Sequence, residues 1–206
     1  MIIVLPNGKQ LSFSPYLNYI LMENFILSCD WGTTSFRLKL VDTRSHQIIA
    51  EVFSNSGILS TYDAWKLSCV QEKTRREDFY LRQLRKHISI LSQKTAVSLS
   101  GIPIIISGMA CSTIGIMELP YAAVPFSIDG SSAIRELLPA SYDFPFNVLL
   151  VSGVRSKNDV MRGEETQIIG LAGIENITTD EITICIFPGT HSKYIKVQNK
   201  EIIELR

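Results

Sequence analysis

The sequence predicts an α/β fold, in which a unit with one mixed sheet is followed by the first hairpin of a second, similar unit. Two observations support this prediction. A strand–turn–strand pattern built on Gly-Thr occurs twice, at residues 25–40 and 182–197. Between the two copies, helical periodicity alternates with short β-branched runs, as expected of a layered α/β protein.

The first copy is an apolar run that leads into a small polar turn. Residues 25–29 (FILSC) precede Asp30 and the turn 31–35 (WGTTS), and residues 36–40 (FRLKL) then alternate apolar with basic side chains. Period-two alternation on both sides of a Gly-Thr turn predicts a hairpin. The run from His46 to Val52 predicts a third strand.

The second copy repeats this form near the other end of the chain. Residues 182–187 (ITICIF) lead into 188–193 (PGTHSK), and 194–197 (YIKV) alternate after the turn. Residues 201–205 (EIIEL) predict the next strand. The chain therefore contains one supersecondary unit and the beginning of another.

A turn of this composition suits phosphate groups. Its backbone N–H groups and Ser/Thr hydroxyls converge on one point, and Asp30 adds a hard carboxylate of the kind that binds Mg²⁺. The alternative is ordinary turn chemistry, because turns favour the same residues. Repetition of the pattern favours the phosphate interpretation.

The middle of the chain predicts helices and buried strands in alternation. We expect helices at 75–91, where Leu81, Leu84, Ile88 and Leu91 have helical spacing, at 131–138 and at 158–172. We expect buried strands at 103–109 and 147–152. Three strands followed by helix, strand, helix, strand and helix is the order of a ribonuclease-H-like domain.

Ionisable residues gather at the expected start of the 158–172 helix. Asp159, Glu164 and Glu165 are candidates for a base that accepts a proton from a substrate hydroxyl, and Arg155 and Arg162 for groups that bind a substrate carboxylate. The alternative is that the carboxylates only cap the helix and interact with its dipole.

Composition excludes several other classes of protein. A formal net charge of zero over 206 residues argues against a general nucleic-acid binder, and no apolar run is long enough to span a membrane. The four cysteines lack metal-ligand spacing, which favours buried thiols in a reducing, cytoplasmic compartment.

We expect residues 1–24 to be an extension, 25–175 a ribonuclease-H-like sugar-binding domain, and 176–206 the start of a second, nucleotide-side domain.

Four segments resemble motifs of the 2-dehydro-3-deoxygalactonokinase family. They are 30–37 (DWGTTSFR), 107–110 (SGMA), 159–167 (DVMRGEETQ) and 188–193 (PGTHSK). The family is similar in fold to the sugar kinase, heat-shock ATPase and actin superfamily. The resemblance implies ATP- and Mg²⁺-dependent phosphorylation of the 6-hydroxyl of 2-dehydro-3-deoxy-D-galactonate, in galactonate breakdown.

Roles for individual residues follow from the motifs and from their places in the chain. Asp159, which lies nearest the strand-end loop, is the expected base, with Glu164 as runner-up, and Asp30 at the end of the first strand is the expected metal ligand. The residues expected to bind nucleotide phosphates are Gly32, Thr33, Thr34, Ser35, Arg37, Gly189, Thr190, His191, Ser192 and Lys193. Those expected to bind the sugar acid are Trp31, Ser107, Gly108, Met109, Arg155 and Arg162. His191 is equally well explained as a turn residue that faces solvent.

The resemblance also suggests a truncated kinase, because members of the family continue well beyond the second phosphate motif. We therefore expect Ile182, Ile184, Ile186, Ile195 and Val197 to lack cover. We expect the chain alone to show no kinase activity and weak or no ATP binding, and its last strands to be mobile, to associate with another copy or to fold back on the first domain. A non-catalytic binding protein and a phosphohydrolase of the same fold are the alternatives. The arginines favour the kinase over the phosphohydrolase, since water as acceptor needs no anchor for a sugar acid.

Overall fold

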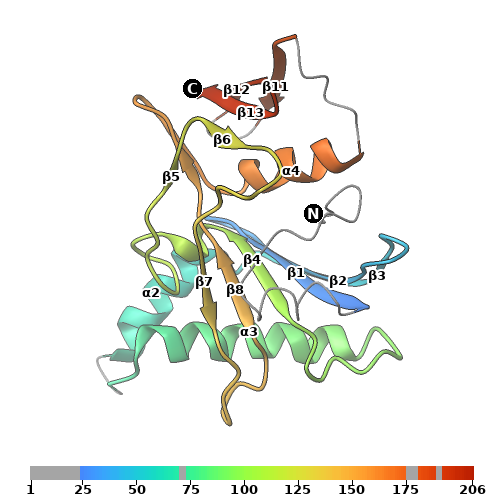
Figure 1. Ribbon diagram of the computed structural model, residues 1–206. Helices are drawn as coiled ribbons and strands as arrows, with labels where there is room; N and C mark the ends of the chain where they lie inside the picture. Colours follow the sequence, from blue (N-terminus) through green and yellow to red (C-terminus); the bar gives the residue numbers. More distant parts are fainter. Residues whose placement is uncertain (1–23, 70–72, 175–180, 189–191) are drawn as a thin grey trace. The chain divides into compact units, whose positions relative to one another are not determined.

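The computed structural model describes residues 24–69, 73–174, 181–188 and 192–206, which form two compact units (Figure 1). The first unit comprises residues 24–119 and 136–151, and the second comprises 120–135 and the described residues from 152 onward. This division groups the last helix with the second hairpin, whereas the sequence analysis assigns it to the first domain. The expected extension at residues 1–24 lies almost wholly outside the described residues.

The first unit is built on a six-stranded mixed sheet with the strand order β3-β2-β1-β4-β8-β7. The first three strands form an antiparallel meander, while β4 is parallel to both β1 and β8. The strands are β1 (Phe25–Trp31), β2 (Phe36–Asp42), β3 (Ile48–Ser54), β4 (Ile104–Gly108), β7 (Arg135–Leu138) and β8 (Val148–Val151). The hairpin, its third strand and both buried strands were predicted from the sequence.

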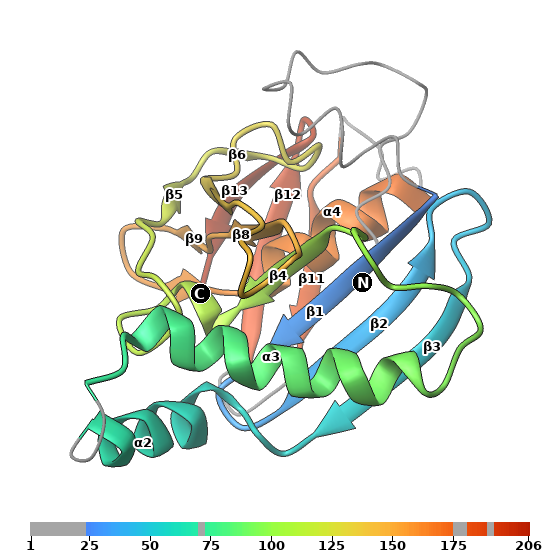
Figure 2. The ribbon, with the colours of Figure 1, turned by 90° about the horizontal axis from the view of Figure 1, so that it is seen from below.

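Two helices belong to the first unit, α2 (Ile58–Cys69) and α3 (Arg76–Ser92), with a short 3-10 helix, η2 (Met109–Cys111), after β4. Figure 2 shows α3 lying along one face of the sheet. It buries Tyr80, Leu84, Ile88 and Leu91, one residue per turn, in the core of this unit. The sequence predicted α3, but it gave no signal for α2.

The described residues of the second unit form two small sheets and one helix. The strands β11 (Thr183–Phe187), β12 (Lys193–Gln198), β13 (Glu201–Leu205) and β6 (Phe126–Ser127) form one sheet in that order. The other sheet has the order β10-β9-β5, with β5 at Ala122–Ala123, β9 at Val154–Arg155 and β10 at Val160–Met161. The helix α4 spans Glu164–Ile174.

Among the described residues, one face of the β11–β13 sheet is covered, while isoleucines on the other face are exposed. Ile195 and Val197 are buried in one core cluster with Ile168 and Ile169 of α4. The expectation that Ile195 and Val197 lack cover is therefore wrong. It is confirmed for three isoleucines, which are about half exposed or more: Ile182 at 54%, Ile184 at 49% and Ile186 at 67%.

Two predicted helices are corrected. Residues 135–138 form strand β7 at the edge of the first sheet, where Leu138 enters the core. Helix-forming side chains are overridden there by tertiary packing. The helix predicted at 158–172 begins only at Glu164, because Gly163 has a φ of 110°, which a helix does not accommodate. Asp159 therefore precedes β10 and is not at a helix start.

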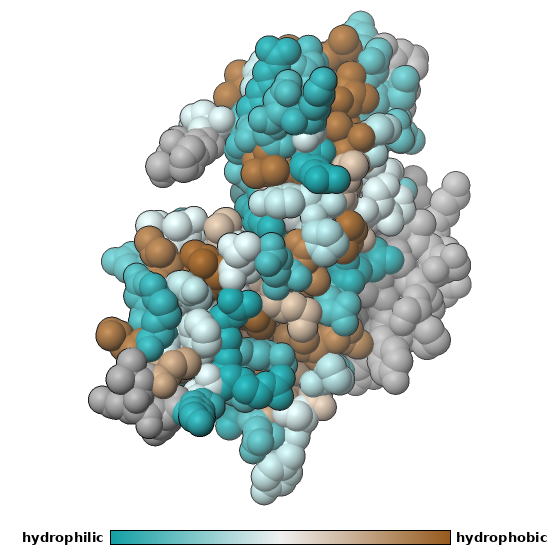
Figure 3. Space-filling view, turned by 90° about the vertical axis from the view of Figure 1, so that its left-hand side faces the viewer, coloured by the Kyte–Doolittle hydropathy of each residue, from teal (hydrophilic) through white to brown (hydrophobic). Residues whose placement is uncertain are grey.

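The surface drawn in Figure 3 mixes polar and apolar side chains. Among the described residues, no helix combines the length and apolar character that crossing a bilayer requires.

Candidate active site

The first candidate phosphate turn closes the β1–β2 hairpin. The N–H of Gly32 donates to the carbonyl oxygen of Ser35 at 2.9 Å, which leaves Thr33 and Thr34 exposed at the tip. The turn therefore presents two hydroxyl side chains to solvent, as a phosphate-binding turn requires.

The start of α2 holds this turn from behind. The N–H of Ile58 donates to the Gly32 carbonyl at 2.9 Å, and that of Leu59 to the Thr33 carbonyl at 3.1 Å. Gly57 makes this approach possible, because a Cβ there would lie 2.3 Å from the Thr33 oxygen. The free N–H groups at the helix start thus fix two turn carbonyls, an anchor that sequence reasoning missed together with α2.

Asp30 lies at the carboxyl end of β1, beside the turn. Its Oδ2 accepts a hydrogen bond from Nη1 of Arg37 at 3.0 Å, and the two side chains are 39% and 46% exposed, respectively. The two residues are direct partners in the β1–β2 register. A predicted metal ligand and a predicted phosphate ligand are therefore paired with each other.

The parallel pairing of β1 with β4 brings a second predicted segment to Asp30. Asp30 is level with Ser107, and Trp31 is level with Gly108. Gly108 has a φ of 91°, and a Cβ on it would lie 2.9 Å from the Trp31 oxygen and 3.4 Å from Oδ1 of Asp30. Only glycine suits this position. Met109, which follows in η2, is partly exposed.

Trp31 has a packing role in this structure. Its side chain is fully buried, its ring contacts Phe36 and Tyr80, and its Nε1 donates to the Ser56 carbonyl at 3.0 Å. Ser107 is also buried, at 4% exposure. Direct contact of either side chain with a sugar acid stays a prediction.

In the second unit, Asp159 lies in the tight loop between β9 and β10. The N–H of Ser156 donates to the Asp159 carbonyl at 2.8 Å, and the Ser156 hydroxyl accepts the N–H groups of Asn158 and Asp159. The same hydroxyl lies 3.1 Å from the Leu205 carbonyl, to which it donates. The loop is thus attached to strand β13.

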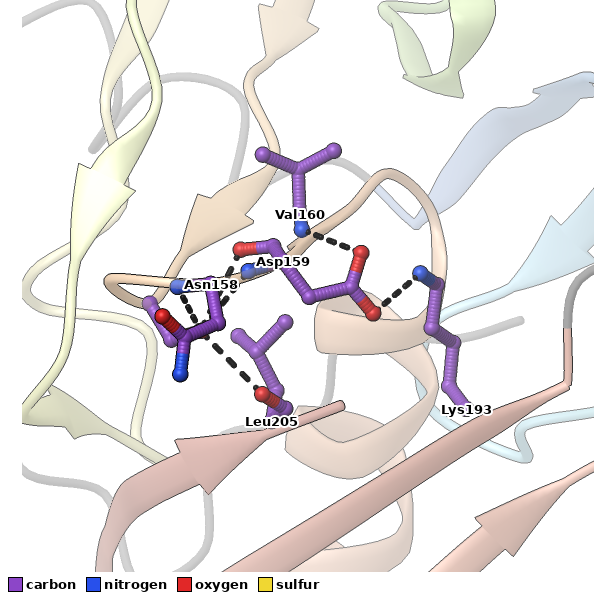
Figure 4. Close-up of polar contacts among 6 residues, drawn as sticks. Asn158, Asp159, Val160, Lys193 and Leu205 are labelled. Atoms are coloured by element: carbon purple, nitrogen blue, oxygen red, sulfur yellow. Dashed lines mark hydrogen bonds and ion pairs between the residues drawn. The ribbon is translucent and has the colours of Figure 1, made fainter.

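The Asp159 carboxylate reaches the second phosphate motif. Its Oδ2 lies 2.6 Å from Nζ of Lys193, and its Oδ1 accepts the N–H of Val160 at 2.8 Å (Figure 4). The Lys193 side chain is only 12% exposed, because strand alternation places it on the same covered face as Ile195. The expected base and an expected phosphate ligand are therefore an ion pair.

Two glutamates open helix α4. Both carboxylate oxygens of Glu165 lie 2.9 Å from the Gly163 nitrogen, whose N–H they accept, and burial raises the pKa of Glu165 to about 8. Glu164 Oε2 is buried without a hydrogen-bond partner among the described residues. A carboxylate that keeps its proton near neutral pH is suited to hold the helix start rather than to carry charge.

The two arginines differ in their surroundings. Nε of Arg162 donates to the Tyr121 hydroxyl at 2.8 Å, and its guanidinium carbon lies 4.0 Å from the centre of the same ring. Arg155 is exposed on β9, level with Val160. Tyr121 was missed by sequence reasoning, because it lies 41 residues before Arg162 and no local pattern marks it.

The remaining predicted residues belong to the second turn. Ser192 is exposed just before β12, while Gly189, Thr190 and His191 lie outside the described residues. In the first unit the structure brings together Asp30, Arg37, the Gly32–Ser35 turn and Gly108; in the second it brings together Asp159 and Lys193.

The side chains suit a magnesium ion that is held mainly by other groups. Within the described ranges, no three His, Cys, Asp or Glu side chains are grouped closely enough to hold a metal ion. Asp30 offers one partly exposed carboxylate, and Mg²⁺ commonly takes one or two carboxylates together with water and phosphate oxygens. The donor set therefore fits Mg²⁺ that arrives with a nucleotide.

Comparison with known proteins gives consistent matches. Residues 30–206 match the family model for 2-keto-3-deoxy-galactonokinase. The chain is 26% identical over 182 residues to a protein of Rhizobium meliloti (strain 1021) named as a probable 2-dehydro-3-deoxygalactonokinase, covering 86% of this chain and 51% of the relative. It is 32% identical over 108 residues to the 2-dehydro-3-deoxygalactonokinase of Escherichia coli (strain K12), covering 50% of this chain and 33% of the relative.

A solved structure agrees with these sequence matches. A crystal structure named for 2-dehydro-3-deoxygalactonokinase, from Sinorhizobium meliloti, superposes with a TM-score of 0.67 at 25% identity, covering 88% of this chain and 52% of that one. The chain thus spans about half the length of this solved structure, and about half the length of the Rhizobium meliloti relative. From its Asp30 motif to its last residue, the chain belongs to the 2-keto-3-deoxy-galactonokinase family.

Proposed function

We propose that this chain supplies the sugar-acid side and both phosphate turns of a kinase that transfers phosphate from ATP to the 6-hydroxyl of 2-dehydro-3-deoxy-D-galactonate. The observation that carries the proposal is the position of Asp30. It lies beside a Gly-Thr-Thr-Ser turn fixed by α2, and next to Gly108 at the end of a parallel strand. Ligands of α/β sheets bind at such carboxyl ends.

The first turn and Lys193 are the proposed phosphate-binding groups. The turn offers neutral donors to phosphate oxygens, namely backbone N–H groups and the Thr33 and Thr34 hydroxyls, whereas Lys193 offers a charged donor. Asp30 would hold Mg²⁺, whose charge neutralises the phosphates during transfer. Arg37 would then exchange its carboxylate partner for a phosphate oxygen.

The second unit is proposed to bind and activate the sugar acid. Arg162, held by Tyr121, and Arg155 are suited to a carboxylate, because guanidinium binds it in a forked manner. Asp159 is the proposed base, with Glu164 as the alternative.

The strand order β3-β2-β1-β4-β8, with β2 antiparallel to β1, supports a ribonuclease-H-like fold for the first unit.

A binding role without turnover has one observation in its favour. Ile184, Ile186 and Ile203 are exposed on the β11–β13 sheet, and β11 has a strand partner on one side only among the described residues. Uncovered apolar edge strands pair readily with other chains. We propose that this sheet takes a further polypeptide, another copy included, before the site is complete.

Sedimentation velocity tests whether copies of the chain associate through the exposed face of this sheet. If copies associate through this face, Ile186→Lys shifts the chain toward monomer, whereas Ile90→Lys, a matched change at a 44% exposed isoleucine on α3, leaves it unchanged. Equal behaviour of both variants would rule out the face as the contact.

The kinase proposal is tested by calorimetry with Mg·ATP and the sugar acid, followed by a coupled assay of ADP release. We expect weak nucleotide binding and no release above background by the isolated chain, because isoleucines on one face of the β11–β13 sheet are exposed. Asp30→Ala should abolish the Mg²⁺-dependent part of binding while the fold stays intact. Unchanged binding by this variant would contradict the role of Asp30, and turnover by the chain alone would show that the site is already complete.

The base can be assigned in any preparation of the chain that shows kinase turnover. Asp159→Asn should lower kcat by roughly 10²–10⁴ with a smaller effect on KM, as expected on loss of a general base. If Glu164→Gln shows this loss and Asp159→Asn does not, Glu164 is the base.

A further inference from the structure

We infer that Lys193 changes partners during the reaction cycle, pairing with Asp159 in the nucleotide-free protein and with a nucleotide phosphate in the complex. Asp159 is thereby kept from acting as a base until the nucleotide is bound. This inference rests on the proposed function, because it assumes that Lys193 binds phosphate and that Asp159 receives the substrate proton.

The first step of the argument is the geometry of the pair. Lys193 Nζ and Asp159 Oδ2 are 2.6 Å apart, at the short end for a charge-assisted hydrogen bond. The carboxylate is 30% and the lysine 12% exposed, so water screens their attraction only in part.

The second step is that the pair is built into the fold rather than made by two free side chains. The Ser156 hydroxyl binds both the Asp159 N–H and the Leu205 carbonyl, which attaches the β9–β10 loop to the sheet that carries Lys193. The Val160 N–H fixes the other carboxylate oxygen (Figure 4). The carboxylate is therefore held in place, and forming the pair costs conformational freedom mainly of the lysine side chain.

The third step is chemical. A carboxylate held by an ammonium group has a lowered proton affinity and is a poor base. A nucleotide phosphate chain carries more negative charge than one carboxylate, so it competes for the same ammonium group. When the lysine turns to phosphate, Oδ2 of Asp159 loses this ion pair and becomes able to accept the proton of a substrate hydroxyl.

The chain offers a matched control on the same strand. Lys196 Nζ lies 2.6 Å from Glu204 Oε2, again between a lysine of β12 and a carboxylate. Strand alternation places Lys196 on the face opposite to Lys193 and away from the proposed site. Substitutions in this pair change the net charge in the same way, but should not alter phosphate affinity.

The experiment measures the affinity of the full chain for Mg·ADP by titration into the millimolar range. We expect Lys193→Met to weaken binding about tenfold, because it removes one charge-assisted hydrogen bond to phosphate. We expect Asp159→Asn to tighten binding about fivefold, because it removes the ion pair that competes for the lysine. In the Lys193→Met background, Asp159→Asn should have no effect. Lys196→Met and Glu204→Gln should leave the affinity unchanged.

The outcomes separate the inference from the proposed function. If Lys193→Met does not weaken binding, the proposed phosphate role fails. If it does, but Asp159→Asn leaves the affinity equal or weaker, the exchange of partners is overturned while the phosphate role stands. Failure of both wild type and Asp159→Asn to bind would also contradict the exchange, because the freed lysine should capture phosphate.

A second measurement needs no substitution. The ¹³C carboxyl resonance of Asp159 should shift on titration with Mg·ADP, and the midpoint of this shift should equal the midpoint of nucleotide binding. The carboxyl resonance of Glu204 should not shift. A stationary Asp159 resonance at saturating nucleotide would overturn the inference even if the variants fold poorly.

Discussion

The β1–β2 hairpin and the β11–β12 hairpin carry the same turn motif, but their carboxylate–cation pairs form in different ways. Asp30 and Arg37 are partners within one hairpin register and are both more than a third exposed. Asp159 and Lys193 are 34 residues apart and largely covered. The first pair is a local feature of its hairpin, whereas the second reports the packing of the β9–β10 loop against a separate sheet.

The two hairpins also differ in what packs against their strands. The first has the start of α2 behind its turn and a sheet covered by α3. The β11–β13 sheet has α4 against one face, while Ile184 and Ile186 are exposed on the other. We infer that the first turn is preorganised by its own unit.

The largest expected effect comes from removing the support of the first turn. A Cβ at Gly57 would meet backbone atoms of Thr33 and Thr34 at 2.3–2.4 Å, so Gly57→Ala should destabilise the first unit by more than about 3 kcal/mol. Urea unfolding followed by tryptophan fluorescence isolates this unit, because both tryptophans, Trp31 and Trp65, belong to it.

Gly101→Ala is the matched control for that variant. Gly101 has a φ of 75° but no atom within 4 Å of a built Cβ, so only backbone strain of about 1 kcal/mol is expected. Equal losses in the two variants would show that contact with α2 does not hold the turn.

The next effect is an opposite pH dependence of the two units. Burial raises the folded-state pKa of Glu165 from 4.5 to about 8, so its contribution is fully present below pH 4.5 and is lost as pH rises through 8. Each pKa unit corresponds to about 1.4 kcal/mol, so the second unit should lose several kcal/mol over this range. Burial lowers the pKa of His87 on α3, so the first unit should instead lose stability as pH falls below 6.5.

Hydrogen exchange of β12 and β1 amides between pH 5 and 8.5, corrected for intrinsic rates, follows both units in one sample. Glu165→Gln should flatten the pH dependence for β12 and leave that for β1 unchanged, whereas Glu181→Gln, at an exposed position, should change neither. A pH dependence for β12 that survives Glu165→Gln would assign it to another group.

A smaller difference should separate the two ion pairs. A double-mutant cycle on unfolding with Asp159→Asn and Lys193→Met should give a coupling of about 1–2 kcal/mol, because the pair is largely covered. The same cycle with Asp30→Asn and Arg37→Met should give about 0.5 kcal/mol, because that pair is exposed to solvent. Equal couplings would remove the distinction between a local pair and a packing-dependent pair.

The sequence could predict the local features of the fold, but not the contacts between distant segments. Alternation around Gly-Thr predicted both hairpins, since local periodicity decides strand faces. Helix α2 was missed because it buries only Ile58 and Thr61, which leaves little apolar periodicity to detect. The Asp159–Lys193 pair and the Tyr121–Arg162 contact join distant segments, and no local spacing encodes such contacts.

The central claim of the proposed function is that each hairpin binds nucleotide phosphate. It is tested most directly by titrating the chain with Mg·ATP while following the amide resonances of Thr33 in the first turn and Lys193 at the start of β12. The account predicts that both resonances shift as Mg·ATP is added, and that Asp30→Ala weakens the response of Thr33. Response of only one hairpin, or of neither, would contradict it.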